Sequence, residues 1–356
     1  MSKRRALSPL SKVWRRTLRA ATGQVLRATQ AATQQVVKKA AKKVAAAHTA
    51  SKPPSDGRGD WIAGLTLSRS GPRRYRLFRP AGIASGARVP LVVMLHGCGQ
   101  DAAGIARSTR MNRVAAREGF FVLYPEQSRL ANPQRCWNWF ETESGRAQEE
   151  MAQILAAIDQ TALLYPMDRA RVAIAGLSAG AGMAALLATA HPDRFRAVAM
   201  HSGVPPGLAS STPSALRAMR GLASPPDIAA PPVGPRDATR GAARGAASDA
   251  PSWPPLLVIQ GTRDRVVARV NAGEAVRQWS VAAGASARAA REVQRGKRHP
   301  MTVTDFKRGS VLAATLVEID GLAHAWSGGA AKEAFSDPAG PDATAMIWRF
   351  FAKHLR

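Results

Sequence analysis

Ser178 lies in the sequence GLSAG at positions 176–180, which matches the pattern G-x-S-x-G. The apolar run before it, 172–176, is typical of a buried strand, and the Ala- and Leu-rich run 179–190 after it predicts a helix. In that context the pattern predicts a sharp strand-to-helix turn that lifts the serine Oγ above the sheet, with glycines giving the backbone room. The helix N-terminus beneath it favours developing negative charge. The pattern therefore predicts a nucleophilic serine.

A serine hydroxyl needs a base, and that base needs an acid to orient it. After a turn of this kind the acid and the histidine follow later in the chain, in that order. Asp264 comes directly after the apolar run 255–261, and His324 comes after the apolar run 312–319. We expect both to meet Ser178 at the carboxyl edge of one sheet. There Asp264 would fix the imidazole tautomer, and His324 would take the serine proton and return it to a leaving alcohol.

Other histidines and acids fit these two roles less well. His201 ends a predicted strand near the serine but precedes every candidate acid loop, so we interpret it as structural and bonded to backbone. Asp320 lies too close to the strand that leads to His324. The remaining alternatives lie in the N-terminal segment, near helix ends, in a charged loop or outside the expected loop: His48, His191, His299, His354, Asp305, Asp337 and Asp342.

Two backbone N–H groups must face the oxygen that becomes negative when the serine attacks. Ala179, directly after the serine, supplies one in this kind of turn. The loop after the first buried strand, HGCGQ at 96–100, contains glycines that let the backbone approach a ligand, and Cys98 is the candidate second donor through its N–H. The turn at Cys98 lacks the strand-to-helix context of Ser178, so we do not expect Cys98 to be a nucleophile. We expect its thiol to pack in the fold, or to form a disulfide with Cys136 in an oxidising compartment.

Alternating apolar runs and helical stretches must position these residues. Residues 61–70 and 73–80 predict an opening antiparallel pair of strands. Further strands are predicted at 90–97, 120–127, 172–176, 196–203, 255–261 and 312–319, and helices at 102–118, 147–165 and 179–190. This rhythm predicts an α/β fold with a mostly parallel, doubly wound sheet, because strands buried on both faces are continuously apolar.

Composition divides the 356 residues into three parts. Residues 1–50 form a basic tail rich in Ala, Lys and Arg, predicted to be helical or disordered. Residues 51–60 form a linker, and residues 61–356 form the catalytic domain. Within this domain, residues 205–254 hold ten of the 24 prolines and a single aromatic residue. We therefore expect a low-complexity surface loop or loosely helical lid, inserted before the strand that bears the acid.

The charge is strongly positive, with 51 Lys and Arg against 24 Asp and Glu. Residues 1–52 carry 13 of these cations and no carboxylate, which favours binding of the tail to an anionic surface such as a granule, a membrane or nucleic acid. For the excess of positive charge in the rest of the chain, a coding bias towards Arg is the simpler explanation. No run approaches the ~20 apolar residues of a membrane span. Lys and Arg also interrupt the N-terminal segment throughout, so no secretory signal is visible.

Five blocks of sequence resemble the short-chain polyhydroxyalkanoate (PHB) depolymerase and esterase family of the α/β-hydrolase superfamily. They are LVVMLHGCGQ, YPEQ with ANPQRCWNWF, AGLSAGAGMA with HPDRFRAVAMHSG, VIQGTRDRVV, and GLAHAWSGG with FSDPAGPDAT, within 60–205 and 252–352. The resemblance implies an α/β-hydrolase fold and the triad Ser178, Asp264 and His324, with the HGC turn as oxyanion donor. It implies hydrolysis of poly(3-hydroxybutyrate)-type polyester or its oligomers, through an acyl-enzyme and without cofactor or metal.

Feruloyl or acetylxylan esters are the alternative substrates that the resemblance implies. Trp137 and Trp139 in one block, and Trp326 in another, are candidates to contact substrate, since aromatic rings stack on a feruloyl ring or lie along an aliphatic polyester. Core packing under a loop is an equally good interpretation of Trp137 and Trp139. Family members are typically secreted, so the resemblance implies an extracellular protein, with a cytoplasmic or granule-associated one as the alternative.

Two other functions compete with ester hydrolysis. One is an anionic-polymer-binding or granule-binding protein on a degenerate hydrolase fold, with the basic tail as its working part. The other is cleavage of an amide, as in peptidases of the same fold. The complete set of serine, acid and histidine candidates argues against a degenerate site.

Overall fold

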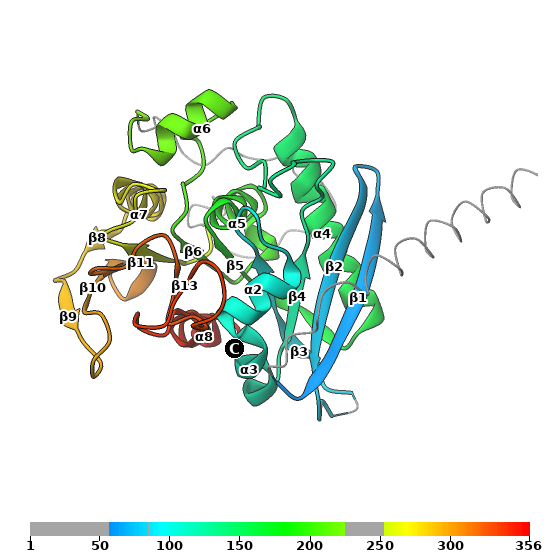
Figure 1. Ribbon diagram of the computed structural model, residues 1–356. Coiled ribbons are helices and arrows are strands. Elements are labelled where there is room, and N and C mark those ends of the chain that lie inside the picture. Colours follow the sequence, from blue (N-terminus) through cyan, green and yellow to red (C-terminus); the bar gives the residue numbers. More distant parts are fainter. Residues whose placement is uncertain (1–56, 85, 225–252) are drawn as a thin grey trace, which may run out of the picture. The chain divides into compact units, whose positions relative to one another are not determined.

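The computed structural model of the chain describes residues 57–84, 86–224 and 253–356. The predicted basic tail, most of the predicted linker, and residues 225–252 of the Pro/Ala-rich segment lie outside the described residues. One mixed sheet of eleven strands runs through the described part (Figure 1). Its order is β1-β2-β4-β3-β5-β6-β7-β11-β10-β8, and β9 pairs with β10.

The strands of this sheet are β1 (Gly59–Ser68), β2 (Gly71–Pro80), β3 (Val89–Leu95), β4 (Phe121–Pro125), β5 (Met167–Leu177), β6 (Ala197–His201), β7 (Leu256–Gly261), β8 (Ser286–Ala287), β9 (Arg291–Val293), β10 (Met301–Arg308) and β11 (Val311–Ile319). The helices are α2 (Ala102–Thr109), α3 (Met111–Glu118), α4 (Arg146–Leu164), α5 (Ala179–Ala190), α6 (Thr212–Met219), α7 (Val270–Ala283) and α8 (Ala343–His354). A 3₁₀ turn, η1 (Pro192–Arg194), follows α5, and β12 (Trp326–Ser327) pairs with β13 (Ser336–Asp337).

The central strands β4, β3, β5, β6, β7 and β11 are parallel to one another. The predicted opening pair of strands is confirmed, since β1 and β2 run antiparallel over their whole length. β2 then joins the parallel strands by pairing antiparallel with β4, and β10 continues the other end antiparallel to β11. The predicted α/β fold with a mostly parallel sheet is therefore confirmed.

Side chains alternate between two separate cores on the two faces of the sheet. In β3, Leu91, Val93 and Leu95 lie in the core that also contains residues of α4, α5 and α7. The intervening Val92 and Met94 lie in the core formed with α2, α3 and α8. Figure 1 shows the helices on both sides of the strands. Because both faces are covered, the buried parts of the central strands are nearly continuous apolar runs, which is the pattern that the sequence displays.

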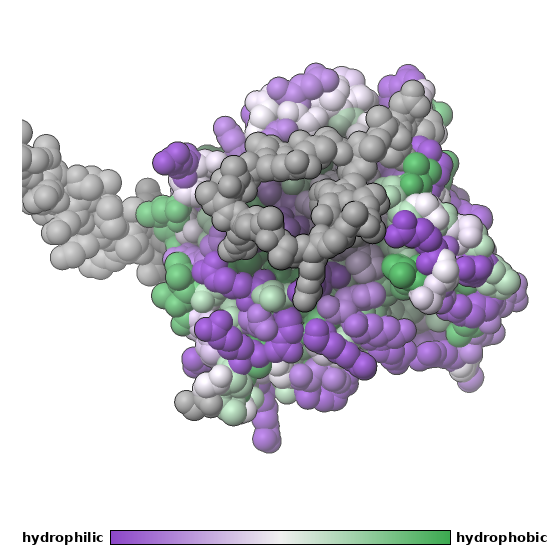
Figure 2. Space-filling view, turned by 180° about the vertical axis from the view of Figure 1, so that it is seen from behind, coloured by the Kyte–Doolittle hydropathy of each residue, from purple (hydrophilic) through white to green (hydrophobic). Residues whose placement is uncertain are grey.

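The predicted helix over 102–118 is two helices, because Arg110 adopts a left-handed conformation with φ 55° and separates α2 from α3. The sequence analysis predicted no strand at β10 and no helix at α7 or α8, and for the segment that contains α6 it predicted only a surface loop or a loosely helical lid. In β10 the alternate positions are polar, and in α7 several of the buried residues are themselves polar, so neither contains a continuous apolar run. In α8 the buried Ile347, Phe350 and Phe351 alternate with less buried residues. Within the described residues, no helix has both the length and the apolar character to cross a membrane. The face in Figure 2 is mostly hydrophilic, with small separate hydrophobic patches.

Candidate active site

Ser178 sits at the turn between β5 and α5 with φ 55° and ψ −120°. This region of backbone space is strained for a residue other than glycine, so surrounding contacts must hold the serine there. Its N–H donates to the carbonyl of His201 at 2.9 Å, and its own carbonyl accepts from the N–H groups of Ala181 and Gly182 at 2.9 and 3.1 Å. Ser178 thus occupies the sharp strand-to-helix turn that the G-x-S-x-G pattern predicts.

The two glycines of the pattern are required by close backbone contacts. A Cβ at Gly176 would lie 2.2 Å from the carbonyl of Gly180. A Cβ at Gly180 would lie 2.3 Å from the carbonyl oxygen of Leu95 and 2.6 Å from that of His96. Glycine therefore lets the start of α5 pack directly on the end of β3, and this contact sets the distance between Ser178 and the loop after β3.

The carboxylate of Asp264 accepts a hydrogen bond from Nδ1 of His324, with 2.8 Å between Nδ1 and Oδ2. Its side chain is fully buried, and Oδ1 also accepts from the N–H groups of Val266 and Val267 at 2.9 Å. Burial raises the pKa of Asp264, but the hydrogen bonds, led by that of His324, outweigh it and hold the pKa below its ordinary value. An ionised carboxylate can only accept, so Nδ1 carries the imidazole proton and Nε2 is left free to accept a hydrogen bond or a proton.

The loops that bear Asp264 and His324 are joined to each other. A Cβ at Gly261 would lie 2.2 Å from the carbonyl of Leu322, and the N–H of Arg263 donates to the same carbonyl at 3.0 Å. Asp320 accepts from the hydroxyl of Thr262 at 3.0 Å, so this exposed acid ties the two loops together and is not bonded to the histidine. These contacts fix the spacing of the acid–histidine pair.

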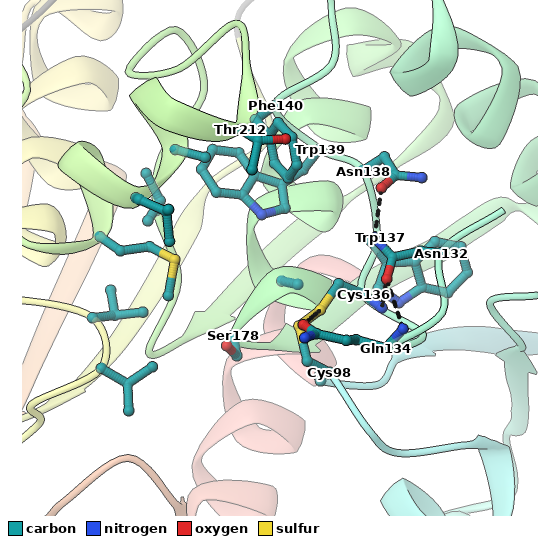
Figure 3. A pocket seen from close by; sticks show the side chains of 18 of the residues that line it. Cys98, Asn132, Gln134, Cys136, Trp137, Asn138, Trp139, Phe140, Ser178 and Thr212 are labelled. Atoms are coloured by element: carbon teal, nitrogen blue, oxygen red, sulfur yellow. Dashed lines mark hydrogen bonds between the residues drawn. A yellow bond between two sulfur atoms is a disulfide. The ribbon is translucent and has the colours of Figure 1, made fainter. Parts of the chain in front are cut away.

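Ser178 and His324 line one cavity of about 470 Å³, and Cys98 and Ala179 line it with them. Figure 3 shows Ser178 beside the disulfide that joins Cys98 to Cys136, the pairing that the sequence left open. Among the described residues, the N–H groups of Cys98 and Ala179 have no protein acceptor. Both predicted oxyanion donors are thus at the cavity with their N–H groups available to a ligand.

The residues of the opposite wall were not predicted, although a loosely helical lid over 205–254 was one of the two alternatives for that segment. This wall comes mainly from α6 and from loops near the acid and the histidine, through Thr212, Ala215, Leu216, Met219, Val266, Val267 and Phe335. α6 lies in the Pro/Ala-rich segment and begins with a capping box between Ser211 and Ser214, with a proline in its first turn. A serine followed by proline at the start of a helix is a recognised start signal, and it was the cue in the sequence.

The three candidate tryptophans have different positions. Trp139 lines the cavity and contacts Phe140 edge-on, and Figure 3 shows both near Thr212, away from Ser178. Trp137 also borders the cavity, but its side chain is wholly buried and its indole N–H donates to the carbonyl of His96 at 3.0 Å. The prediction for Trp326 is wrong, because its ring is fully buried and it does not line the cavity.

A buried polar network supports the loop that carries these aromatics. Glu150 accepts from the backbone N–H and the side-chain amide of Asn138 at 2.9 and 2.7 Å, and also from the amide of Gln127. Arg73 donates to Gln127 and stacks over the ring of Trp137 at 5.2 Å. Burial raises the pKa of Glu150, although its hydrogen bonds oppose that change. A lone carboxylate on the buried side of α4 was the signal for this network.

His201 links the nucleophile turn to the histidine loop. Its carbonyl accepts from Ser178, its Nε2 accepts from the N–H of Ser327 at 3.1 Å, and its ring stacks on Trp326 with 5.0 Å between centroids. Burial lowers the pKa of His201 to about 3, so the ring is neutral near pH 7. The structural role predicted for it, bonded to backbone, is confirmed. Within the described ranges, no group of three or more His, Cys, Asp or Glu is placed to hold a metal ion.

Acid is expected to destabilise the fold from about pH 6.5 downward. Burial lowers the pKa of His201 to about 3 and that of His96 to about 4, whereas in the unfolded chain both lie near 6.5. Between these values the unfolded state binds more protons, so the free energy of unfolding falls as pH falls, by up to ~1.4 kcal/mol per pH unit for each histidine. Urea unfolding at pH 7.5, 6.5 and 5.5, followed by tryptophan fluorescence, measures this slope. An equal free energy at pH 6.5 and 5.5 would contradict the assignment.

Comparison with known proteins places the chain in a family. The family model described as "Esterase PHB depolymerase" matches residues 73–298. Poly(3-hydroxyalkanoate) depolymerase C from Paucimonas lemoignei is 32% identical over 210 residues, covering 59% of this chain and 49% of that protein. Feruloyl esterase B from Neurospora crassa is 29% identical over 220 residues, covering 59% and 71%. The chain thus spans about half the length of the Paucimonas protein.

Solved structures agree with this placement at the level of the fold. An acetyl xylan esterase from Aspergillus awamori superposes with a TM-score of 0.60 at 17% sequence identity, over 82% of this chain and 100% of that one. The family match covers more than half of the chain and includes Ser178 and Asp264. The chain therefore has an α/β-hydrolase fold and belongs to the esterase PHB depolymerase family.

Proposed function

We propose that this chain is a serine carboxylic-ester hydrolase that acts through Ser178, His324 and Asp264. The single observation that carries the proposal is the buried 2.8 Å bond between Asp264 and His324, in a site whose cavity also contains a serine held at φ 55°. Strain of this kind concentrates at functional positions. Membership of a family that contains depolymerases and esterases supports the same reaction class.

In the proposed reaction, Oγ of Ser178 attacks the ester carbonyl carbon while its proton passes to Nε2 of His324. The N–H groups of Cys98 and Ala179 donate to the oxyanion that forms. The imidazolium, stabilised by Asp264, then gives its proton to the leaving alcohol as the C–O bond breaks, which leaves an acyl-serine. Water, deprotonated by His324, attacks this acyl group, and the proton returns to Oγ as the carboxylic acid departs.

We propose aliphatic hydroxy-acid esters of the poly(3-hydroxybutyrate) type, as polymer or oligomers, as the substrate class. The far wall of the cavity supports this choice, because Leu216, Met219 and Val267 present hydrocarbon with no charged group among them. Apolar walls with few polar groups favour aliphatic chains. Feruloyl esters are the second candidate, since Trp139 and Phe140 offer aromatic faces in the same cavity.

The test compares wild-type protein with Ser178→Ala on p-nitrophenyl butyrate, a 3-hydroxybutyrate trimer and methyl ferulate. We expect the wild type to hydrolyse the butyrate ester and the trimer, and Ser178→Ala to lose at least 10³-fold in kcat on each, because no other nucleophile is activated at the site. Equal turnover by both proteins would overturn the serine mechanism. Faster hydrolysis of methyl ferulate than of the trimer would replace the proposed substrate class with the second candidate.

A further inference from the structure

A second cavity, of about 590 Å³, lies at the other end of the sheet from β1. α8 packs over β6 and β7, and the cavity lies beside it over β10 and β11. Its floor is apolar and belongs to the same core as α8: Leu257, Val303, Leu312, Val317, Met346 and Phe350. We call it the β10–α8 groove. In this kind of fold both faces of the sheet are usually covered, so an open apolar floor needs an explanation.

The rim of the β10–α8 groove is cationic on both sides. From α8 it receives the cations Arg349 and Lys353, which share one helix face with the floor residue Phe350. His354 lies on the same face, but burial lowers its pKa, so its ring is a neutral polar group near pH 7. From β9, β10 and the β9–β10 loop it receives Arg291, Arg295 and Lys307. A smaller adjoining cavity of about 130 Å³ shares Arg295 and Arg349 and adds Arg298, which donates to the carbonyl of Gly340. It also contains one carboxylate, Asp342, which caps the start of α8 by accepting from the N–H of Ala345 at 2.9 Å. The groove therefore combines a hydrocarbon floor with converging positive charge.

The one carboxylate that lines the groove, that of Asp305, already has a cationic partner. Asp305 is paired with Arg291 at 3.0 Å and accepts from the hydroxyl of Thr315 at 2.8 Å. Although burial raises the pKa of Asp305, these bonds outweigh it and hold the pKa below its ordinary value. It therefore stays ionised and committed to Arg291, and it does not balance the cations on the other side of the groove.

Four polar groups at the rim lack a partner in the described part of the chain. The side chains of Arg295, Arg349 and Lys353 make no hydrogen bond or ion pair with a described residue. Nε2 of His354 is buried and has no hydrogen-bond partner among those residues. Buried polar atoms are normally satisfied, so an unpartnered one beside a cavity is consistent with a ligand that supplies the missing group.

We propose that the β10–α8 groove binds an amphiphilic carboxylate. Its hydrocarbon chain lies on the floor around Val303, Val317 and Phe350, and its carboxylate lies among Arg349, Lys353 and Arg295. Charge complementarity selects an anion, since charge-assisted bonds to Arg and Lys are the strong class of hydrogen bond. The volume is within the range of small-molecule sites. The basic segment 1–52 has the wrong sign of charge to be the occupant, because it carries no carboxylate.

The test measures binding of decanoate to the full chain by isothermal titration at 50 mM and 500 mM NaCl. Decan-1-ol, which has the chain without the charge, and acetate, which has the charge without the chain, are the matched probes. The variant Arg349→Gln/Lys353→Gln removes two exposed charges and leaves the floor intact. Arg295→Gln removes a charge from the other side. Arg58→Gln/Arg74→Gln, at exposed positions at and near the β1–β2 edge, is the control for net charge.

We expect decanoate to bind at least tenfold more tightly than either probe at 50 mM NaCl, and to weaken at 500 mM because salt screens exposed charges. Arg349→Gln/Lys353→Gln should weaken it about tenfold and Arg295→Gln by a smaller factor, while the control variant binds as the wild type does. Binding of decanoate with the same Kd to all four proteins, as binding in the Ser178 cavity would give, overturns the proposal. So does equal binding of decan-1-ol and decanoate, because the charge would then have no role.

Discussion

Asp264→Asn is expected to lower kcat for p-nitrophenyl butyrate by about 10³- to 10⁴-fold, with little change in KM. The carboxylate accepts from Nδ1 of His324 and holds the proton on that nitrogen. An asparagine in its place can present its amide N–H to Nδ1, which then becomes the acceptor and moves the proton to Nε2. In that tautomer His324 cannot take the proton of Ser178. Binding of the ester does not require the proton transfer, so KM is spared.

Asp320→Asn is the matched control for this prediction. Asp320 lies four residues before His324, is exposed, and bonds to the hydroxyl of Thr262, which an asparagine oxygen can still accept. We expect its kcat to stay within about threefold of the wild type, with a change in stability below ~1 kcal/mol. Steady-state kinetics at pH 7.5 on both variants, with circular dichroism to check folding, decides the assignment. A larger loss in Asp320→Asn than in Asp264→Asn would assign the acid role to Asp320.

The catalytic candidates could be predicted because each follows a strong local signal. Ser178 lies in a five-residue pattern between an apolar run and a helix, and Asp264 and His324 each lie in the loop that follows an apolar run. Parallel strands buried on both faces need apolar residues at every position, so their ends are visible in the sequence. That is why the carboxyl ends of the central strands, and the meeting of the serine and the histidine at that edge, could be predicted.

The rest of the site depends on contacts between distant segments, which leave no local pattern. Trp326 was a candidate substrate contact as an aromatic residue in a block that resembles the family, yet its ring lies in the core and its indole N–H donates to the hydroxyl of Thr344 at 3.0 Å. The α6 wall was hidden because Pro- and Ala-rich composition predicts no core. Its buried Ala215 and Ala218 nevertheless pack, because small side chains suit close contact, and Ala218 accepts a bond from Asn271. Composition therefore failed to predict packing at α6, where the buried residues are small.

Gly180→Ala is expected to destabilise the fold by about 3 kcal/mol and to lower kcat by at least ~10²-fold. Alanine is normally the better residue in a helix, so intrinsic propensity alone predicts the opposite sign. Here the added Cβ would lie 2.3 Å from the carbonyl oxygen of Leu95, a backbone atom that cannot swing aside. α5 must instead move away from β3. That movement separates the N–H of Ala179 from the N–H of Cys98, the two proposed donors to the oxyanion.

Gly273→Ala in α7 is the control that separates the steric clash from the general effect of replacing a helical glycine by alanine, because a Cβ at Gly273 meets no atom within 4 Å. We expect this control to raise the free energy of unfolding by up to ~1 kcal/mol and to leave kcat unchanged. Urea unfolding and p-nitrophenyl butyrate kinetics on both variants provide the measurements. If Gly180→Ala were as stable and as active as Gly273→Ala, the contact between α5 and β3 would not set the site. If Gly180→Ala folds but has a lower kcat at unchanged KM, the result would show that Gly180 keeps the N–H groups of Ala179 and Cys98 at the spacing that the transition state requires.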